Sequence, residues 1–177
     1  MTSDNPILVG IFDGFSWIRC EAKGSFVNSP IVKAFGTERI AAGETCLIVD
    51  LGACTGMDST FMGTLAGIAA RLSAREGGVL QIAEAGERNR RSLEDLGLNY
   101  LLEIDPPAAI WRGRVADIRS MLKRPQTPVT AGQVQRTRHI LAAHQKLSEI
   151  SGHNARQFED VITLLENELK ASDKPTE

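Results

Sequence analysis

Two hydroxyl side chains lie at the point where a short apolar run leads into a helical pattern. Residues 46–49 form a run rich in branched side chains that Asp50 closes, which is typical of a buried strand. Between residues 62 and 72, apolar side chains recur at helical spacing. Asp58-Ser59-Thr60 lies between the two patterns. The sequence therefore predicts a strand that passes through a polar turn into a helix, with both hydroxyls at the helix start.

A hydroxyl at a helix start can serve in two ways. It can accept a hydrogen bond from an unpaired amide of the first turn and act as an ordinary cap. The same amides and the positive end of the helix dipole can also hold an anion, including a phosphate attached to the hydroxyl itself. Taken alone, the tripeptide favours a cap; the order of the elements around it favours a regulated or nucleophilic hydroxyl.

A nucleophilic Ser59 would need a base, and the histidines do not suggest one. His139, His144 and His153 all lie in the last third of the chain, and the first two are five residues apart, which suits one helix face poorly. We expect each of them to be solvated. No Gly-x-Ser-x-Gly motif is present, and no group of Cys, His or carboxylate residues has metal-ligand spacing. We therefore expect no enzyme activity, no metal and no cofactor.

The composition indicates a soluble cytoplasmic protein. The 177 residues allow one domain plus an extension, and an apolar fraction of 42% is enough for a packed core. A net charge of −2 argues against a broad nucleic-acid or membrane-binding surface. The three cysteines have no metal spacing and suggest buried free thiols in a reducing compartment. We find no secretory signal at the start and no apolar run of the roughly 18 residues that a membrane span needs.

The order of elements predicts an α/β fold with a mixed, mostly parallel sheet of four or five strands and flanking helices. Two strands around Asp13-Gly14 are expected to form a hairpin. The later elements are expected as a helix over 28–42, a strand over 46–50, a helix from about 59, a strand over 79–83, a helix over 88–96, a strand over 98–104 and a helix over 108–122.

A change of composition predicts that residues 1–124 form the α/β domain and residues 125–177 a linker and helical extension. Two prolines between Lys123 and Val129 mark the linker. Two amphipathic helices, over 130–150 and 153–171, meet at Gly152, so we expect an antiparallel helical hairpin. Thr130 is the predicted cap of the first helix, with Gln133 as its capping-box partner.

The pattern as a whole resembles the STAS domain, the fold of bacterial anti-sigma factor antagonists and stressosome proteins. The residues that carry the resemblance are Leu47-Ile48-Val49-Asp50-Leu51 and Met57-Asp58-Ser59-Thr60 before a helix, within a stretch from Ile7 to Leu122. The resemblance implies a protein that takes part in transcription regulation by partner switching. It would bind a serine kinase that otherwise holds a sigma factor, and a phosphatase could be a further partner.

In such a protein the kinase phosphorylates the residue just after the motif aspartate, and the antagonist then lets go. Here that residue is Ser59, with Thr60 as the second candidate, while Asp58 would shape the loop. The partner-binding residues implied by the resemblance are Asp58, Ser59, Thr60, Phe61, Met62 and Asn28. Members of the family often carry a glycine two or three positions after the aspartate, whereas this chain has Thr60 and Phe61 there and its glycine only at Gly63. We expect an exposed Phe61 to alter the partner surface.

Other roles of the fold stay open. The chain could be a STAS scaffold of a stressosome-like assembly or a subunit of a lipid-transport complex, and the extension favours an assembly role. Its hairpin could pack on the parent domain or pair with a second copy to make a homodimer. Arg88, Arg90 and Arg91 are expected to form a solvated helix face, although they could receive an acidic partner or a phosphate.

Overall fold

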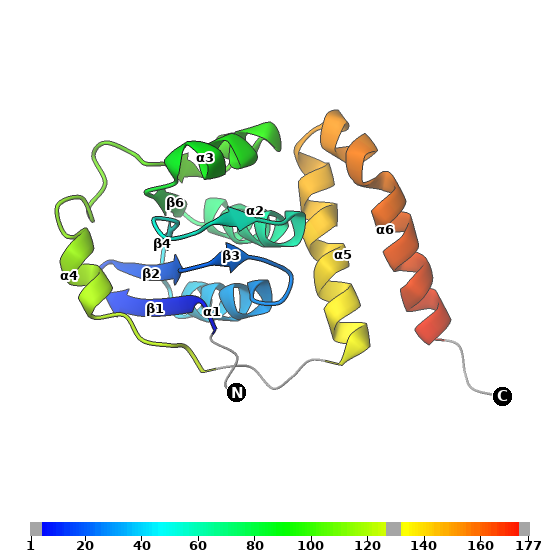
Figure 1. Cartoon of the computed structure of the whole chain (residues 1–177), viewed down its shortest axis with the longest axis horizontal. Coiled ribbons are helices and arrows are strands. Elements are labelled where there is room, and N and C mark those ends of the chain that lie inside the picture. Colours follow the sequence, from blue (N-terminus) through cyan, green and yellow to red (C-terminus); the bar gives the residue numbers. More distant parts are fainter. Residues whose placement is uncertain (1–4, 127–131, 174–177) are drawn as a thin grey trace.

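A five-stranded sheet forms the centre of the molecule (Figure 1). The computed structural model describes residues 5–126 and 132–173. The strand order is β1-β2-β4-β6-β7, with β1 (Ile7–Phe12) antiparallel to β2 (Phe15–Cys20) and all other pairs parallel. The predicted mixed, mostly parallel sheet with an opening hairpin is therefore confirmed. The hairpin turns at Gly14, whose φ of 86° is readily available only to glycine.

The strand predicted over 46–50 is the middle strand of this sheet. β4 (Cys46–Asp50) pairs with β2 on one side and with β6 (Val79–Ala83) on the other. Because it has neighbours on both edges and helices above it, its side chains from Leu47 to Asp50 are all buried. A second, two-stranded sheet joins β3 (Lys23–Gly24) to β5 (Gly56–Met57), next to the start of the following helix.

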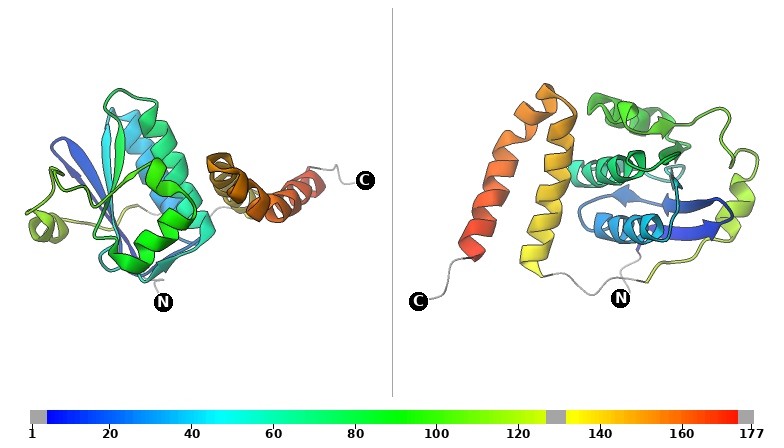
Figure 2. Two further views of the ribbon diagram at one scale, coloured as in Figure 1. Left: turned by 90° about the horizontal axis from the view of Figure 1, so that it is seen from above. Right: turned by 180° about the vertical axis from the view of Figure 1, so that it is seen from behind.

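Helices cover the two faces of the sheet unequally. In the left view of Figure 2, α1 (Ser29–Ala41), α2 (Ser59–Ser73) and α3 (Gly86–Asp95) lie on one face, and the short α4 (Val115–Ser120) lies on the other. The larger apolar cluster lies under the three helices, and a smaller one lies on the opposite face. The smaller cluster consists of Phe15, Trp17, Ile48, Ala83, Trp111 and Ile118.

Two predicted elements are wrong. Only Glu103–Ile104 (β7) of the strand expected over 98–104 is a strand, and Leu98–Tyr100 (η1) is a single 3-10 turn. Leu98 and Leu102, four residues apart, both point into the core, so this segment turns instead of extending. The helix expected over 108–122 is reduced to α4. The chain reverses at Gly113, which has a φ of 77°, and Trp111 enters the smaller cluster from a turn.

The two C-terminal helices pack together as predicted. α5 (Gln133–Ile150) and α6 (Gly152–Ser172) are joined at Ser151, whose hydroxyl caps α6 by accepting from the amide of Asn154 at 3.1 Å. The predicted cap Thr130 lies outside the described residues. In both figures α5 lies beside α1, α2 and α3, and α6 is the outer layer. No helix within the described residues is long and apolar enough to cross a membrane.

Candidate functional site

The cap of α2 is Asp58, and not one of the hydroxyls that follow it. One carboxylate oxygen of Asp58 accepts a hydrogen bond from the amide of Phe61 at 2.8 Å. The other accepts from the amide of Phe26 at 2.8 Å, which ties the loop before α1 to the start of α2. Since a carboxylate already satisfies the first turn of the helix, the Ser59 hydroxyl is not needed as its cap.

The Ser59 hydroxyl instead contacts α5. Its Oγ lies 2.9 Å from Nε2 of His144. The other ring nitrogen, Nδ1, lies 2.7 Å from the carbonyl oxygen of Ile140, which can only accept, so Nδ1 carries the proton. Nε2 is then the acceptor, and Ser59 donates to it. The expectation that His144 is solvated is wrong: the ring is buried and makes an edge contact with Phe158.

A second serine and histidine pair joins α5 to the start of α1. Ser29 Oγ lies 2.7 Å from His139 Nε2. Burial and the nearby charge of Lys33 lower the pKa of His139 to about 4, against a smaller opposing effect of Asp58, so the ring is neutral at pH 7. His139 is half-buried and does not fit the solvated prediction, whereas His153 is exposed as expected. Both serines at the two helix starts are thus bound by histidines of the extension.

The other residues predicted at the partner surface lie at different depths. Ser59 is half-buried, Thr60 and Met62 are buried, and Phe61 is completely buried. The predicted exposure of Phe61 is wrong because its ring packs against the backbone of Gly24, where an added Cβ would come within 2.8 Å of the ring. Phe61 is therefore part of the core beneath the site.

Asn28 lies before α1 but does not cap it with its side chain. Its Oδ1 accepts from the Ser25 amide at 2.9 Å, and its Nδ2 donates to the Lys23 carbonyl at 2.8 Å. These bonds hold the 24–28 loop closed, and two large apolar side chains of this loop, Phe26 (51% exposed) and Val27 (70% exposed), face solvent next to Asp58. Sequence reasoning missed these two residues, although two apolar side chains inside a polar loop are a signal for a contact surface.

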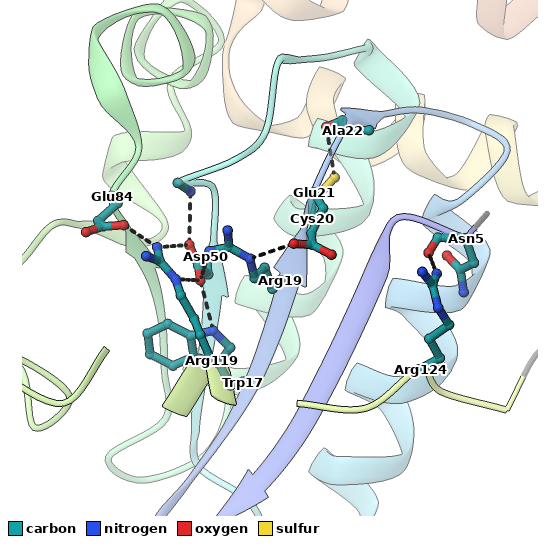
Figure 3. Close-up of polar contacts among 11 residues, drawn as sticks. Asn5, Trp17, Arg19, Cys20, Glu21, Ala22, Asp50, Glu84, Arg119 and Arg124 are labelled. Atoms are coloured by element: carbon teal, nitrogen blue, oxygen red, sulfur yellow. Dashed lines mark hydrogen bonds and ion pairs between the residues drawn. The ribbon is translucent and has the colours of Figure 1, made fainter. Parts of the chain in front are cut away.

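A buried carboxylate stabilises the loop that leads from β4 to α2 (Figure 3). Asp50 accepts from Arg19 Nη1 at 2.8 Å, from Arg119 Nε and Nη2 at 2.9 Å each, and from the Gly52 amide at 2.9 Å. It also accepts from the indole of Trp17 at 3.2 Å. Burial alone would raise the pKa of Asp50, but the hydrogen bonds of Arg119, Gly52 and Arg19 outweigh it and lower the pKa.

The same network attaches the chain after β6 to α4. Arg119 also pairs with Glu84, a residue in the left-handed region with a φ of 51°. The amide of Glu84 donates to Asp105 at 2.6 Å, which supports this unusual backbone. From the sequence, Asp50 marks the end of a strand and forms part of the motif that resembles the STAS domain, with no partner predicted for its carboxylate. The network was missed because Arg119 is 69 residues away.

The basic residues of α3 are largely engaged by the protein's own carboxylates. Arg90 pairs with Glu94 and Asp105 at 3.6 Å each, and Arg91 pairs with Glu87 at 3.0 Å. These contacts agree with a solvated helix face.

A groove beside α5 does not open onto the Ser59–His144 pair. It has a volume of about 210 Å³ and lies between α1, α2 and α5. Its lining includes Lys33, Arg71, His139 and Lys146, but neither Ser59 nor His144. Although His144 is oriented as a base would be, it faces Ser59 inside a helix–helix contact. Within residues 5–126 and 132–173, no three Cys, His, Asp or Glu side chains are grouped to hold a metal ion.

The sequence over residues 7–107 places this chain in a known family. The STAS domain family matches residues 7–107, and the chain belongs to that family, whose members are usually non-catalytic. The helical hairpin α5–α6 lies beyond the matched residues. A comparison with curated proteins found no match.

Two solved structures share the fold. One is a protein assigned as an anti-sigma factor antagonist from Thermotoga maritima, with 18% identity, 63% of this chain and 92% of that chain covered, and a TM-score of 0.52. The other is an anti-sigma factor antagonist from Mycobacterium paratuberculosis, with 21% identity, 64% and 92% covered, and a TM-score of 0.50. At these identities the likeness describes the fold alone.

Proposed function

We propose that this chain is a non-enzymatic cytoplasmic regulator of the anti-sigma factor antagonist type. It binds a serine kinase that acts as an anti-sigma factor, and it releases this partner when Ser59 is phosphorylated. The observation that carries the proposal is that Ser59 stands at the start of α2 with Asp58 as the cap, so its hydroxyl has no capping role and is left for modification once α5 is displaced from it. Thr60 is the weaker candidate because it is buried.

The charge of a phosphate explains why the change would act on binding and not on folding. A phosphate on Ser59 adds about −1.5 to −2 charges. The positive end of the α2 dipole tolerates this charge locally. The core under the site is unaffected because Phe61 and Leu65 are held in place by apolar packing. A partner packed against the start of α2, in contrast, would repel the phosphate and would also have to remove its bound water, so the partner would bind more weakly.

The surface offered to the partner consists of Asp58 and Ser59 with the neighbouring apolar pair Phe26 and Val27. Large apolar side chains that stay exposed next to a polar switch residue are typical of a protein contact. Met62 and Asn28 contribute through the shape of the helix start and of the loop, since both are buried. A phosphatase that acts on the same serine would restore binding.

The test is a quantitative pull-down with the full chain. Wild type and Ser59→Ala should retain the same kinase, and Ser59→Asp should lose at least about tenfold in affinity through like-charge repulsion. Ser73→Asp is the matched control, because Ser73 is an exposed serine at the other end of α2. The captured kinase should also phosphorylate Ser59 with ATP, as read by mass spectrometry. Equal binding by Ser59→Asp and Ser59→Ala would refute the switch.

A second candidate function is an assembly subunit, either of a stressosome-like scaffold or of a lipid-transport complex. It is favoured by the hairpin of α5 and α6, which lies within the extension that we propose as a separate unit over residues 125–177. The outer helix α6 leaves Leu164 59% exposed, and a second copy could bind there. Light scattering would show a stable dimer that Leu164→Gln breaks up. A monomer at all concentrations would favour the regulator.

A further inference from the structure

The extension occupies the surface around Ser59. α5 lies along the starts of α1 and α2 and reaches the end of α3 (Figures 1 and 2). Ser29 and Ser59 each hydrogen-bond a histidine of α5. Beyond the end of α5, the side chain of Asn154 donates to the carbonyl of Leu96 at 2.8 Å. Three separate polar contacts therefore hold the hairpin at one position on the domain.

A single glycine allows the two helices to touch. At Gly63, an added Cβ would lie 2.2 Å from the carbonyl oxygen of Ala143, which is closer than real atoms approach. The backbones of α2 and α5 are thus in direct contact one turn after Ser59. At Gly67, one turn further along α2, an added Cβ would meet only the Lys146 side chain, at an ordinary 3.8 Å. The contact with α5 therefore depends on Gly63 and not on Gly67.

The contact is polar for a helix packed on a domain. Among the buried side chains of α5, Leu147 is large, apolar and fully enclosed, and Leu141 keeps a little exposure. The other buried side chains are small or polar: Thr137, Ala143 and His144. Much of the fit comes from hydrogen bonds and from the close approach at Gly63. Such a contact is sensitive to a charge placed in its middle, because a buried polar group without a partner is costly.

We propose that the surface formed by Ser29, Ser59 and Gly63 is a helix-docking surface, that the chain's own α5 occupies it, and that a phosphate on Ser59 excludes α5. The identity of the modification rests on the proposed function. The kinase transfers the γ-phosphoryl group of ATP to Ser59 Oγ; a P–O bond forms there, the bond to ADP breaks, and the hydroxyl proton is released.

The phosphate conflicts with the docked helix for two reasons. Ser59 now donates to Nε2 of His144, and a phosphate dianion has no proton to donate in its place, so the neutral ring loses the hydrogen bond that it accepts. The phosphate group is also too large for the site, because Ser59 Oγ and His144 Nε2 are in direct contact and the backbones of α2 and α5 touch at Gly63. α5 must therefore leave when the phosphate is added, and a partner must displace α5 to reach Ser59. A helix with an alanine-sized residue opposite Gly63 fits the freed surface.

The first experiment measures hydrogen exchange of residues 133–150 in the full chain. Gly63→Ala should raise their exchange rate about tenfold or more, because α5 loses the packing that protects it. Gly67→Ala is the matched control and should exchange like wild type. Both substitutions raise the helix propensity of α2 equally, so a difference between them reports the contact with α5. Unchanged exchange of residues 46–50 shows that the domain stays folded. Equal exchange in the two variants would overturn the proposed contact.

The second experiment uses the full chain with phosphoserine incorporated at position 59 and its phosphatase-treated form as control. Phosphoserine should raise the exchange of residues 133–150 as Gly63→Ala does. Exchange as slow as in wild type, or slower, would overturn the proposal; slower exchange would indicate that His144 binds the phosphate. If the hairpin is released but no kinase binds the chain, the proposed function fails and this inference stands. If phosphorylation of Ser59 weakens kinase binding while the hairpin stays docked, this inference fails and the proposed function stands.

Discussion

Replacing Asp50 by asparagine should destabilise the domain strongly. The side chain is completely buried and accepts hydrogen bonds from Arg19, Arg119, Trp17 and the Gly52 amide. Asparagine keeps the shape but removes the negative charge, and its NH2 group would point hydrogen-bond donors at the donors that now bind the carboxylate. Removing one partner of a buried ion pair costs about 3–5 kcal/mol. We expect the lower end, about 3 kcal/mol, because the side chain of Arg119 is 28% exposed and can be partly rehydrated.

The measurement is urea unfolding followed by tryptophan fluorescence. Both tryptophans of the chain report on this region, since Trp17 bonds to Asp50 and its ring lies 5.8 Å from that of Trp111. Asp117→Asn is the matched control, because Asp117 is an exposed carboxylate on the same short helix as Arg119, and it should change stability by less than about 0.5 kcal/mol.

A double-mutant cycle with Arg119→Met should give a coupling energy of at least about 1 kcal/mol. The lowered pKa of Asp50 adds a dependence on pH. A carboxyl with a depressed pKa stabilises the folded state above its ordinary value of 3.8 and loses this contribution as the pH falls through the folded value. Wild type should therefore lose stability in acid more steeply than Asp50→Asn. A cost below about 1 kcal/mol for Asp50→Asn would refute the reasoning.

Two further predictions concern single side chains. Burial and Lys33 lower the pKa of His139 to about 4, so as the pH falls from 6.5 to 4 the undocked form takes up a proton that the docked form resists. The protection of α5 against exchange, taken relative to the intrinsic exchange rate at each pH, should therefore fall. His139→Gln should abolish this dependence and His153→Gln should keep it; equal slopes would contradict the assignment. The neighbouring thiol of Cys20 lowers the pKa of Cys54, whereas burial raises that of Cys46 to about 11. Iodoacetamide at pH 7 should therefore alkylate Cys54 at least about tenfold faster than Cys46, as read by mass spectrometry, and equal rates would contradict the shifts.

The sequence determined those elements whose residues carry a local signal. The turn at Asp13-Gly14, the branched run before Asp50 and the amphipathic repeat of α6 each appear as predicted. Their periodicity and turn chemistry depend on neighbours in the chain, so a linear pattern is sufficient. Residues 98–104 and 108–122 were predicted wrongly because there the burial of Leu98 and Trp111 in the finished core outweighs local propensity.

The candidate site shows the same division. The sequence placed Ser59 at a helix start after Asp58, because an aspartate and two hydroxyls between a strand and a helix are a local cap signal. Only the tertiary structure decided that Phe61 is buried, that Arg119 pairs with Asp50, and that the partner of Ser59 is His144, 85 residues further along the chain. Contacts between distant helices depend on how closely their backbones approach, here at Gly63, and no local pattern specifies that distance.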